Sequence, residues 1–91
     1  MRESSIEKAI CAHAKALGVT VQKQNGPGER GKADRLFMRK GVAAFLEIKR
    51  TGQEPTALQY KYLRERNADG FPASWTDNIA EGVKFLNDVF K

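Results

Sequence analysis

The segment that most restricts the fold is VAAFLEIK, at residues 42–49. Its apolar residues fall on both faces of an extended chain until the last few positions, which is typical of a central strand covered on both sides. The preceding run, DRLFMR at residues 34–39, predicts a second strand, and Lys40 and Gly41 predict a tight turn. The sequence therefore predicts a β-hairpin whose second strand lies inside a sheet.

A helix and a strand are predicted before the hairpin. Ser4 followed by Glu7 has the spacing of a capping box that opens a helix, and Gly18 supplies a stop. Apolar residues between them recur on one helical face: Ile6, Ile10, Ala14 and Leu17. Residues 19–24 alternate as a half-buried strand does, and the Gly-rich residues 25–32 predict a loop.

Two helices and one strand are predicted after the hairpin. Thr56 and Gln59 repeat the capping-box spacing at the start of a helix over residues 56–67. Residues 71–76 predict a short strand, which Pro72 places toward a sheet edge. The last helix has two capping candidates and an apolar stripe: Asp77 and Asn78, then Ile79, Val83, Leu86 and Phe90.

The order of elements is helix, three strands, helix, strand, helix. This order predicts an α/β fold with a mixed four-stranded sheet flanked by helices. The 91 residues have the length of one domain, residues 1–91. A domain this small buries a modest share of its surface, so a second copy would help to stabilise it.

The hairpin makes a geometric prediction about two carboxylates. If the turn has two residues, the register places Asp34 directly opposite Glu47, with Cβ atoms about 5 Å apart on one sheet face. Lys49 lies two residues beyond Glu47 and therefore shares that face. A bulged three-residue turn would shift this pairing.

Two facing carboxylates beside an amine indicate metal chemistry. The carboxylates repel each other, and a divalent cation such as Mg²⁺, which prefers oxygen ligands, would compensate. Lys49 could orient or help deprotonate an attacking water, so the set fits metal-assisted phosphodiester hydrolysis. The alternative is structural: Asp34 ends a loop, while Glu47 and Lys49 lie at a frayed strand end.

The charge of the chain is compatible with nucleic-acid binding. There are 16 Lys and Arg against 11 Asp and Glu, a net charge of +5. This excess favours contact with phosphate backbones, although it also serves solubility. No apolar run approaches the roughly 20 residues of a membrane helix, so no membrane partner is expected.

Two other site classes are set aside. Cys11 is the single cysteine and His13 the single histidine, too few for a zinc site within one chain. The lone cysteine also fits an intracellular location without disulfides. Residues 26–33 (GPGERGKA) nearly match a phosphate-binding loop but end in alanine, so no nucleotide cofactor is expected.

Taken together, four segments resemble the VRR-NUC family of the PD-(D/E)xK nuclease superfamily, over nearly the whole chain. They are Ser5-Ile6-Glu7, GKADR at residues 31–35, FLEIKR at residues 45–50 and TGQEPTALQ at residues 51–59. The resemblance implies a restriction-endonuclease-like core for the predicted α/β sheet. The last two segments, in that order and spacing, are the most specific.

The resemblance also implies roles for individual residues. The metal ligands would be Asp34, Glu47, the backbone carbonyl of Ile48 and, directly or through water, Glu7. Lys49 would be the catalytic lysine, and Gln59 would orient that lysine or the scissile phosphate. For Glu7 the alternative is that it only closes the capping box with Ser4.

Basic and aromatic side chains supply candidates for DNA contact. The strongest basic candidates are Arg30, Lys32 and Arg50 in loops flanking the site, with Lys61 on the following helix. Tyr60, Tyr62 and Trp75 could stack on bases, but core packing is favoured for Tyr62 and Trp75.

We therefore expect a Mg²⁺- or Mn²⁺-dependent DNA endonuclease. The resemblance to small phage and bacterial members implies a homodimer acting on branched DNA, as a Holliday-junction resolvase does, inside a bacterial or phage-infected cell. One alternative is a flap or nicking repair nuclease. The other is a non-catalytic basic module that binds DNA.

Overall fold

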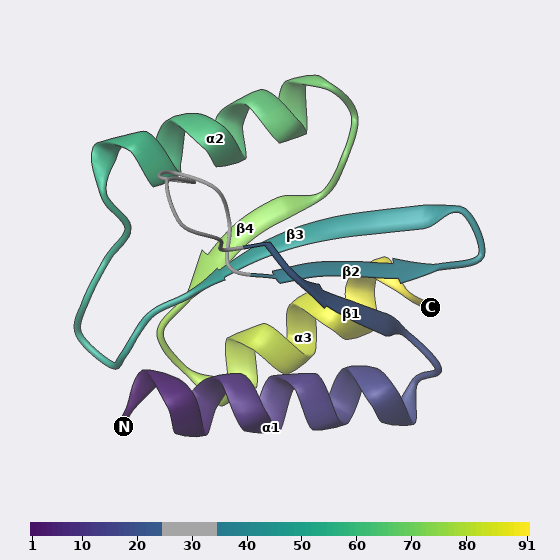
Figure 1. Ribbon diagram of the computed structural model, residues 1–91, viewed down its shortest axis with the longest axis horizontal. Helices are drawn as coiled ribbons and strands as arrows, with labels where there is room; N and C mark the ends of the chain where they lie inside the picture. The colour runs from purple at the N-terminus through teal and green to yellow at the C-terminus, as the bar shows by residue number, and fades with distance from the viewer. Residues whose placement is uncertain (25–34) are drawn as a thin grey trace.

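The computed structural model describes residues 1–24 and 35–91. Its elements follow the predicted order of helix, three strands, helix, strand and helix (Figure 1). They are α1 (Glu3–Ala16), β1 (Thr20–Lys23), β2 (Arg35–Arg39), β3 (Val42–Ile48), α2 (Ala57–Ala68), β4 (Ala73–Thr76) and α3 (Ile79–Val89). No helix of the described ranges is both long and apolar enough to cross a bilayer.

The four strands form one mixed sheet in the order β1-β2-β3-β4. β2 is antiparallel to both β1 and β3, whereas β4 runs parallel to β3. The prediction that residues 42–49 form an inner strand is confirmed, as is the edge position of β4. Pro72 lies just before β4, where its carbonyl accepts a 2.9 Å hydrogen bond from the Phe45 amide.

The hairpin has the predicted two-residue turn. Lys40 and Gly41 have φ angles of 47° and 82°, the left-handed values that a tight hairpin of the favoured twist requires at both central positions. Arg39 faces Val42, and the register continues without a bulge to Arg35 opposite Leu46. The predicted register is therefore confirmed for every described pair of β2 and β3.

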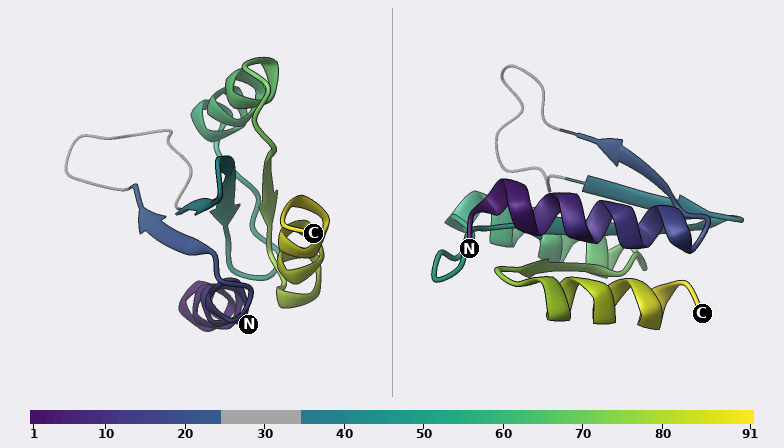
Figure 2. Two further views of the ribbon diagram at one scale, coloured as in Figure 1. Left: turned by 90° about the vertical axis from the view of Figure 1, so that its right-hand side faces the viewer. Right: turned by 90° about the horizontal axis from the view of Figure 1, so that it is seen from below.

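Helices cover the two faces of the sheet unequally. α1 and α3 lie side by side on one face, and α2 lies on the other (Figures 1 and 2). The main core lies under α1 and α3 and consists of fully buried apolar side chains: Ile6, Ile10, Ala14, Phe37, Ala44, Leu46, Ile48 and Leu86. On the α2 side, Phe45 meets Tyr62 edge to face at 5.9 Å.

The predicted start of α1 differs from the structure, whereas the predicted cap of α3 is confirmed at Asn78. Arg2 is the N-cap of α1 and makes no side-chain cap, so the capping box of Ser4 and Glu7 is wrong; the helix begins earlier, and Ser4 lies within its first turn. At α3, Asn78 is the cap and accepts from the Glu81 amide at 2.8 Å. The other capping candidate, Asp77, instead accepts from the Gly52 amide.

Candidate active site

Glu47 and Lys49 come together at the end of β3, on the sheet face that α2 covers. Phe45 lies two residues before Glu47 on the same face and contacts α2. The Lys49 Nζ lies 3.5 Å from the Glu47 Oε2. The predicted pairing of these two side chains on one face is therefore present.

Both side chains are withdrawn from water. The side chain of Glu47 is 1% exposed and that of Lys49 is 12% exposed. A glutamate is almost never this buried unless a partner compensates its charge, because desolvation of a carboxylate is costly. The ammonium of Lys49 supplies part of that compensation, and a cation bound to the carboxylate would supply more.

The backbone holds this pair firmly in place. Ile48 and Glu47 are buried in β3, and β3 continues its parallel pairing with β4 up to Ile48 opposite Thr76. The Lys49 amide then donates to the Thr76 carbonyl at 2.9 Å. This hydrogen bond therefore holds the backbone of Lys49 against β4, although β3 itself ends one residue earlier.

Several predicted site residues lie outside the described part of the chain: Asp34, Arg30 and Lys32. Within residues 1–24 and 35–91, no three His, Cys, Asp or Glu side chains converge closely enough to hold a metal ion. The metal ligands predicted from the sequence therefore stay predictions. Among them, the described Glu47 and the backbone of Ile48 lie side by side at the end of β3.

Glu7 forms an ion pair instead of a helix cap. Its Oε1 lies 2.7 Å from the Arg35 Nη2, with both side chains largely buried. Arg35 pairs with Leu46 and therefore points to the sheet face opposite to that of Glu47. The alternative role of Glu7 as a capping residue is thus wrong, and its role at a metal stays a prediction.

Gln59 occupies the first turn of α2 and closes a capping box. Its side-chain carbonyl accepts from the Thr56 amide at 2.9 Å, and its own amide donates to the Thr56 hydroxyl at 3.2 Å. The predicted capping box of this helix is confirmed. The catalytic role of Gln59 stays a prediction.

The loop between Lys49 and α2 is tied to the β4–α3 junction. The Gly52 amide donates to the Asp77 carboxylate at 3.0 Å, and the Thr51 hydroxyl donates to the Asp77 carbonyl at 3.1 Å. Hydrogen bonds from Gly52 and then Asn78 lower the pKa of Asp77. The sequence indicated Asp77 only as a helix cap, because a contact across 25 residues leaves no local pattern.

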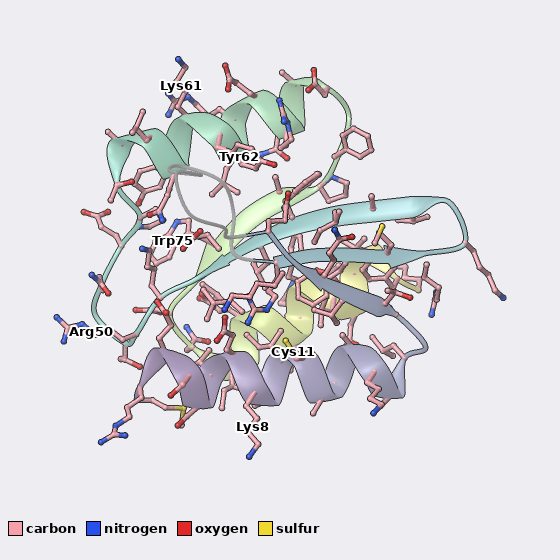
Figure 3. The ribbon with its side chains drawn as sticks, in the orientation of Figure 1. Lys8, Cys11, Arg50, Lys61, Tyr62 and Trp75 are labelled. Atoms are coloured by element: carbon pink, nitrogen blue, oxygen red, sulfur yellow. The ribbon has the colours of Figure 1, made fainter. Side chains whose placement is uncertain are left out.

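Two basic candidates border this loop. Arg50 is exposed directly after Lys49, and Lys61 is exposed on α2 (Figure 3). Their predicted role in DNA contact stays a prediction.

The aromatic residues divide into two groups. Tyr62 packs edge to face on Phe45 with Arg66 4.8 Å above its ring, so the predicted packing role is confirmed for Tyr62. Tyr60 instead meets Trp75 at 6.3 Å with perpendicular rings. Its hydroxyl donates to the Glu54 carboxylate at 2.8 Å, and this bond is the main cause that raises the pKa of Tyr60.

Known proteins resemble this chain in sequence and in fold. The chain is 37% identical, over 62 residues and 67% of each chain, to "Putative nuclease p44" of Acyrthosiphon pisum secondary endosymbiont phage 1. A solved structure described as "VRR_NUC domain" superposes with a TM-score of 0.82 at 23% identity, over 98% of this chain and 97% of the other. Another, "VRR_NUC domain protein", gives 0.79 at 13% identity, over 98% and 88%. No family model matches the chain.

Proposed function

Because this chain belongs to the VRR-NUC family of nucleases, we propose that it is a metal-dependent endonuclease that hydrolyses phosphodiester bonds in DNA. The observation that carries the proposal is the buried carboxylate of Glu47, 3.5 Å from the ammonium of Lys49, at the end of an inner strand. A buried acid beside a largely buried amine is uncommon, and such ionisable groups cluster at functional sites.

The residues present suit a hard divalent cation. Glu47, the Ile48 carbonyl, Asp34 and Glu7 are all oxygen donors, which Mg²⁺ and Mn²⁺ prefer. The described β2–β3 register runs without a bulge, which supports the predicted position of Asp34 opposite Glu47. Such an ion, when bound, would polarise the scissile phosphate and help to generate hydroxide.

Lys49 would act on the reacting groups directly. Its ammonium would hold the attacking water in line with the phosphorus, or stabilise the charge that develops on the phosphate oxygens. Glu47 keeps that ammonium in place through their ion pair. Gln59 would orient Lys49 or the phosphate from the start of α2.

The substrate we propose is branched DNA, cut by a homodimer. Two copies related by a twofold axis would present two sites to a four-way junction. Arg50 and Lys61 would hold the phosphate backbone on the α2 side, and the sequence adds Arg30 and Lys32 as further candidates for phosphate contact. An intracellular location in a bacterium or a phage-infected cell stays a prediction.

Cleavage assays with variants test this proposal. Wild-type protein with Mg²⁺ or Mn²⁺ is expected to cut a synthetic four-way junction in preference to a flap or a plain duplex. Glu47→Gln and Lys49→Ala are expected to reduce the cleavage rate by about 100-fold or more while DNA binding is retained. Lys84→Ala is the matched control, since Lys84 is 76% exposed and lies on α3, across the sheet.

The results separate the alternatives. A preference for flaps or nicked DNA would replace the junction substrate with that of a repair nuclease. Wild-type protein that binds DNA but cuts no substrate with either metal would overturn the nuclease proposal in favour of a non-catalytic binding module.

A further inference from the structure

Trp75 lies immediately beside the candidate active site. It is the direct strand partner of Glu47 in the parallel pairing of β3 and β4, so both side chains stand on the α2-covered face. Neighbouring strands lie about 4.8 Å apart, so the backbones of Trp75 and Glu47 are one strand spacing apart. Figure 3 shows Trp75 below the first half of α2, near the loop that carries Arg50.

Tyr60 extends this aromatic surface toward solvent. Its ring stands at 90° to the Trp75 ring, and its hydroxyl is bound to Glu54 at the surface. Tyr60 and Trp75 are both only partly buried. Tyr62 differs from them, since its hydroxyl turns to the part-buried Gln24 and its ring packs against Phe45.

The charge around this pair disfavours a phosphate as its ligand. Glu54 is bound to Tyr60, so a carboxylate lies at the solvent end of the rings, whereas the carboxylate of Glu47 next to Trp75 already pairs with Lys49. A neutral, flat group meets no such repulsion and gains from stacking on an aromatic side chain. The nucleobases of DNA are groups of this kind.

We propose that Trp75 and Tyr60 form a stacking wall for an unpaired nucleobase next to the scissile phosphate. The inference rests on the proposed nuclease function and names the feature of the substrate that the site would recognise. A base inside a duplex has both faces covered by its neighbours, whereas a base at a branch, bulge or flap offers a free face. The wall therefore selects DNA with an unstacked nucleotide at the cut.

Fluorescence provides a direct test of the contact, because Trp75 is the only tryptophan of the chain. The probes are a DNA duplex with a two-thymine bulge, the same duplex fully paired, and the bulged duplex with abasic nucleotides in the bulge. They are titrated into the Glu47→Gln variant with Mg²⁺, which keeps the DNA uncut. We expect the thymine bulge to quench the fluorescence and the other two probes to leave it nearly unchanged. Equal quenching by all three probes, or none by any, would overturn the stacking wall.

Cleavage by the unmodified site provides a second test. Abasic nucleotides are placed at the branch or bulge of whichever substrate the wild-type protein cuts. We expect them to lower kcat/KM by about 5- to 100-fold, the usual value of one base stacked on an aromatic side chain. The ratio of kcat/KM between normal and abasic DNA should be smaller in Trp75→Leu and in Tyr60→Leu. Trp75→Phe, which keeps an aromatic ring, should restore part of that ratio.

Tyr62→Leu is the matched control. It removes an aromatic ring from the same helix and should slow the cutting of normal and abasic DNA by the same factor. Tyr60→Leu keeps the test valid if Trp75→Leu fails to fold. If the wild-type protein cleaves normal and abasic DNA with the same kcat/KM, the stacking wall is rejected and the nuclease proposal is unaffected. If it cleaves no DNA at all, the nuclease proposal itself is rejected.

Discussion

At the scale of single residues, Gly82 determines how closely two helices approach. A Cβ at this position of α3 would overlap the Ile10 Cδ1 and lie 2.8 Å from the Ile10 Cγ1 on α1. The missing side chain thus allows α1 and α3 to pack together over the main core. Ile10 itself is fully buried, so it has little room to move.

We predict that Gly82→Ala destabilises the protein by about 1–3 kcal/mol, the usual cost of overpacking a core. The sign of this stability change is informative, because helix propensity alone would make alanine more stable than glycine by about 1 kcal/mol. Urea unfolding measures the change. The control is Ala80→Gly at an exposed position of the same helix, which measures the effect of helix propensity alone. If Gly82→Ala instead stabilises the protein, the close packing of α1 and α3 is contradicted.

Arg39 joins three separate parts of the fold. From the end of β2, its guanidinium donates to the Leu17 carbonyl at 2.9 Å and to the Phe90 and Lys91 carbonyls at 3.0 Å. It also lies 5.7 Å from the centre of the Phe90 ring. One side chain thus binds the C-terminal ends of α1 and α3 to the hairpin.

We expect Arg39→Lys to lower the free energy of unfolding by about 1–3 kcal/mol. The single ammonium of lysine cannot donate to all three carbonyls in the geometry of the planar guanidinium. Thermal unfolding followed by circular dichroism checks this. Arg64→Lys, an exposed change on α2, serves as the control and should have little effect.

At the scale of elements, α2 raises the question of whether Gln59 caps the helix or serves the reaction. A glutamate accepts the same hydrogen bond in a capping box, so Gln59→Glu should leave the stability nearly unchanged. If the Gln59 amide also donates to the phosphate, the same variant should cleave at least about 10-fold more slowly. Full activity of Gln59→Glu would restrict this residue to its structural role.

The loop after Lys49 should respond to acid through Asp77. The folded protein lowers the pKa of Asp77 below its ordinary value of 3.8, chiefly through the Gly52 amide. The carboxylate therefore stabilises the fold above that value, and the stabilisation is lost as pH falls through the lower folded pKa.

The difference in unfolding free energy between wild type and Asp77→Asn is thus expected to be present at neutral pH and to diminish below about pH 4. Urea unfolding at a series of pH values measures it. Asp88, whose pKa is lowered by Lys84, titrates in the same direction, so Asp88→Asn is measured in parallel. A difference independent of pH would contradict the Asp77–Gly52 contact.

At the scale of the whole molecule, net charge and size lead to predictions about DNA and about assembly. DNA affinity should fall linearly on a log–log plot against salt, because each phosphate contact releases counterions. Arg50→Ala and Lys61→Ala should each reduce that slope by about 1. Lys84→Ala should not, since Lys84 already pairs with Asp88 on α3, across the sheet from α2.

Assembly is tested by sedimentation or light scattering. The proposed homodimer has twice the 10.2 kDa mass of the chain. A monomer at concentrations at which the protein cuts both arms of a junction would contradict the dimer.

The amino-acid sequence by itself determined the elements and the hairpin register. Period-2 and helical patterns and short-range turn chemistry are local, so VAAFLEIK, Lys40-Gly41 and the Thr56 capping box could be identified from neighbouring residues alone. The pairing of Glu47 with Lys49 on one face followed from the same alternation.

Only the tertiary structure decided which distant groups satisfy one another. Glu7 pairs with Arg35 rather than with its own helix start, and Asp77 binds Gly52 rather than capping α3. Trp75 comes next to Glu47 through a parallel pairing whose strands are joined by α2. A charged or polar side chain takes the partner that compensates its desolvation best, and that partner becomes available only when the chain has folded.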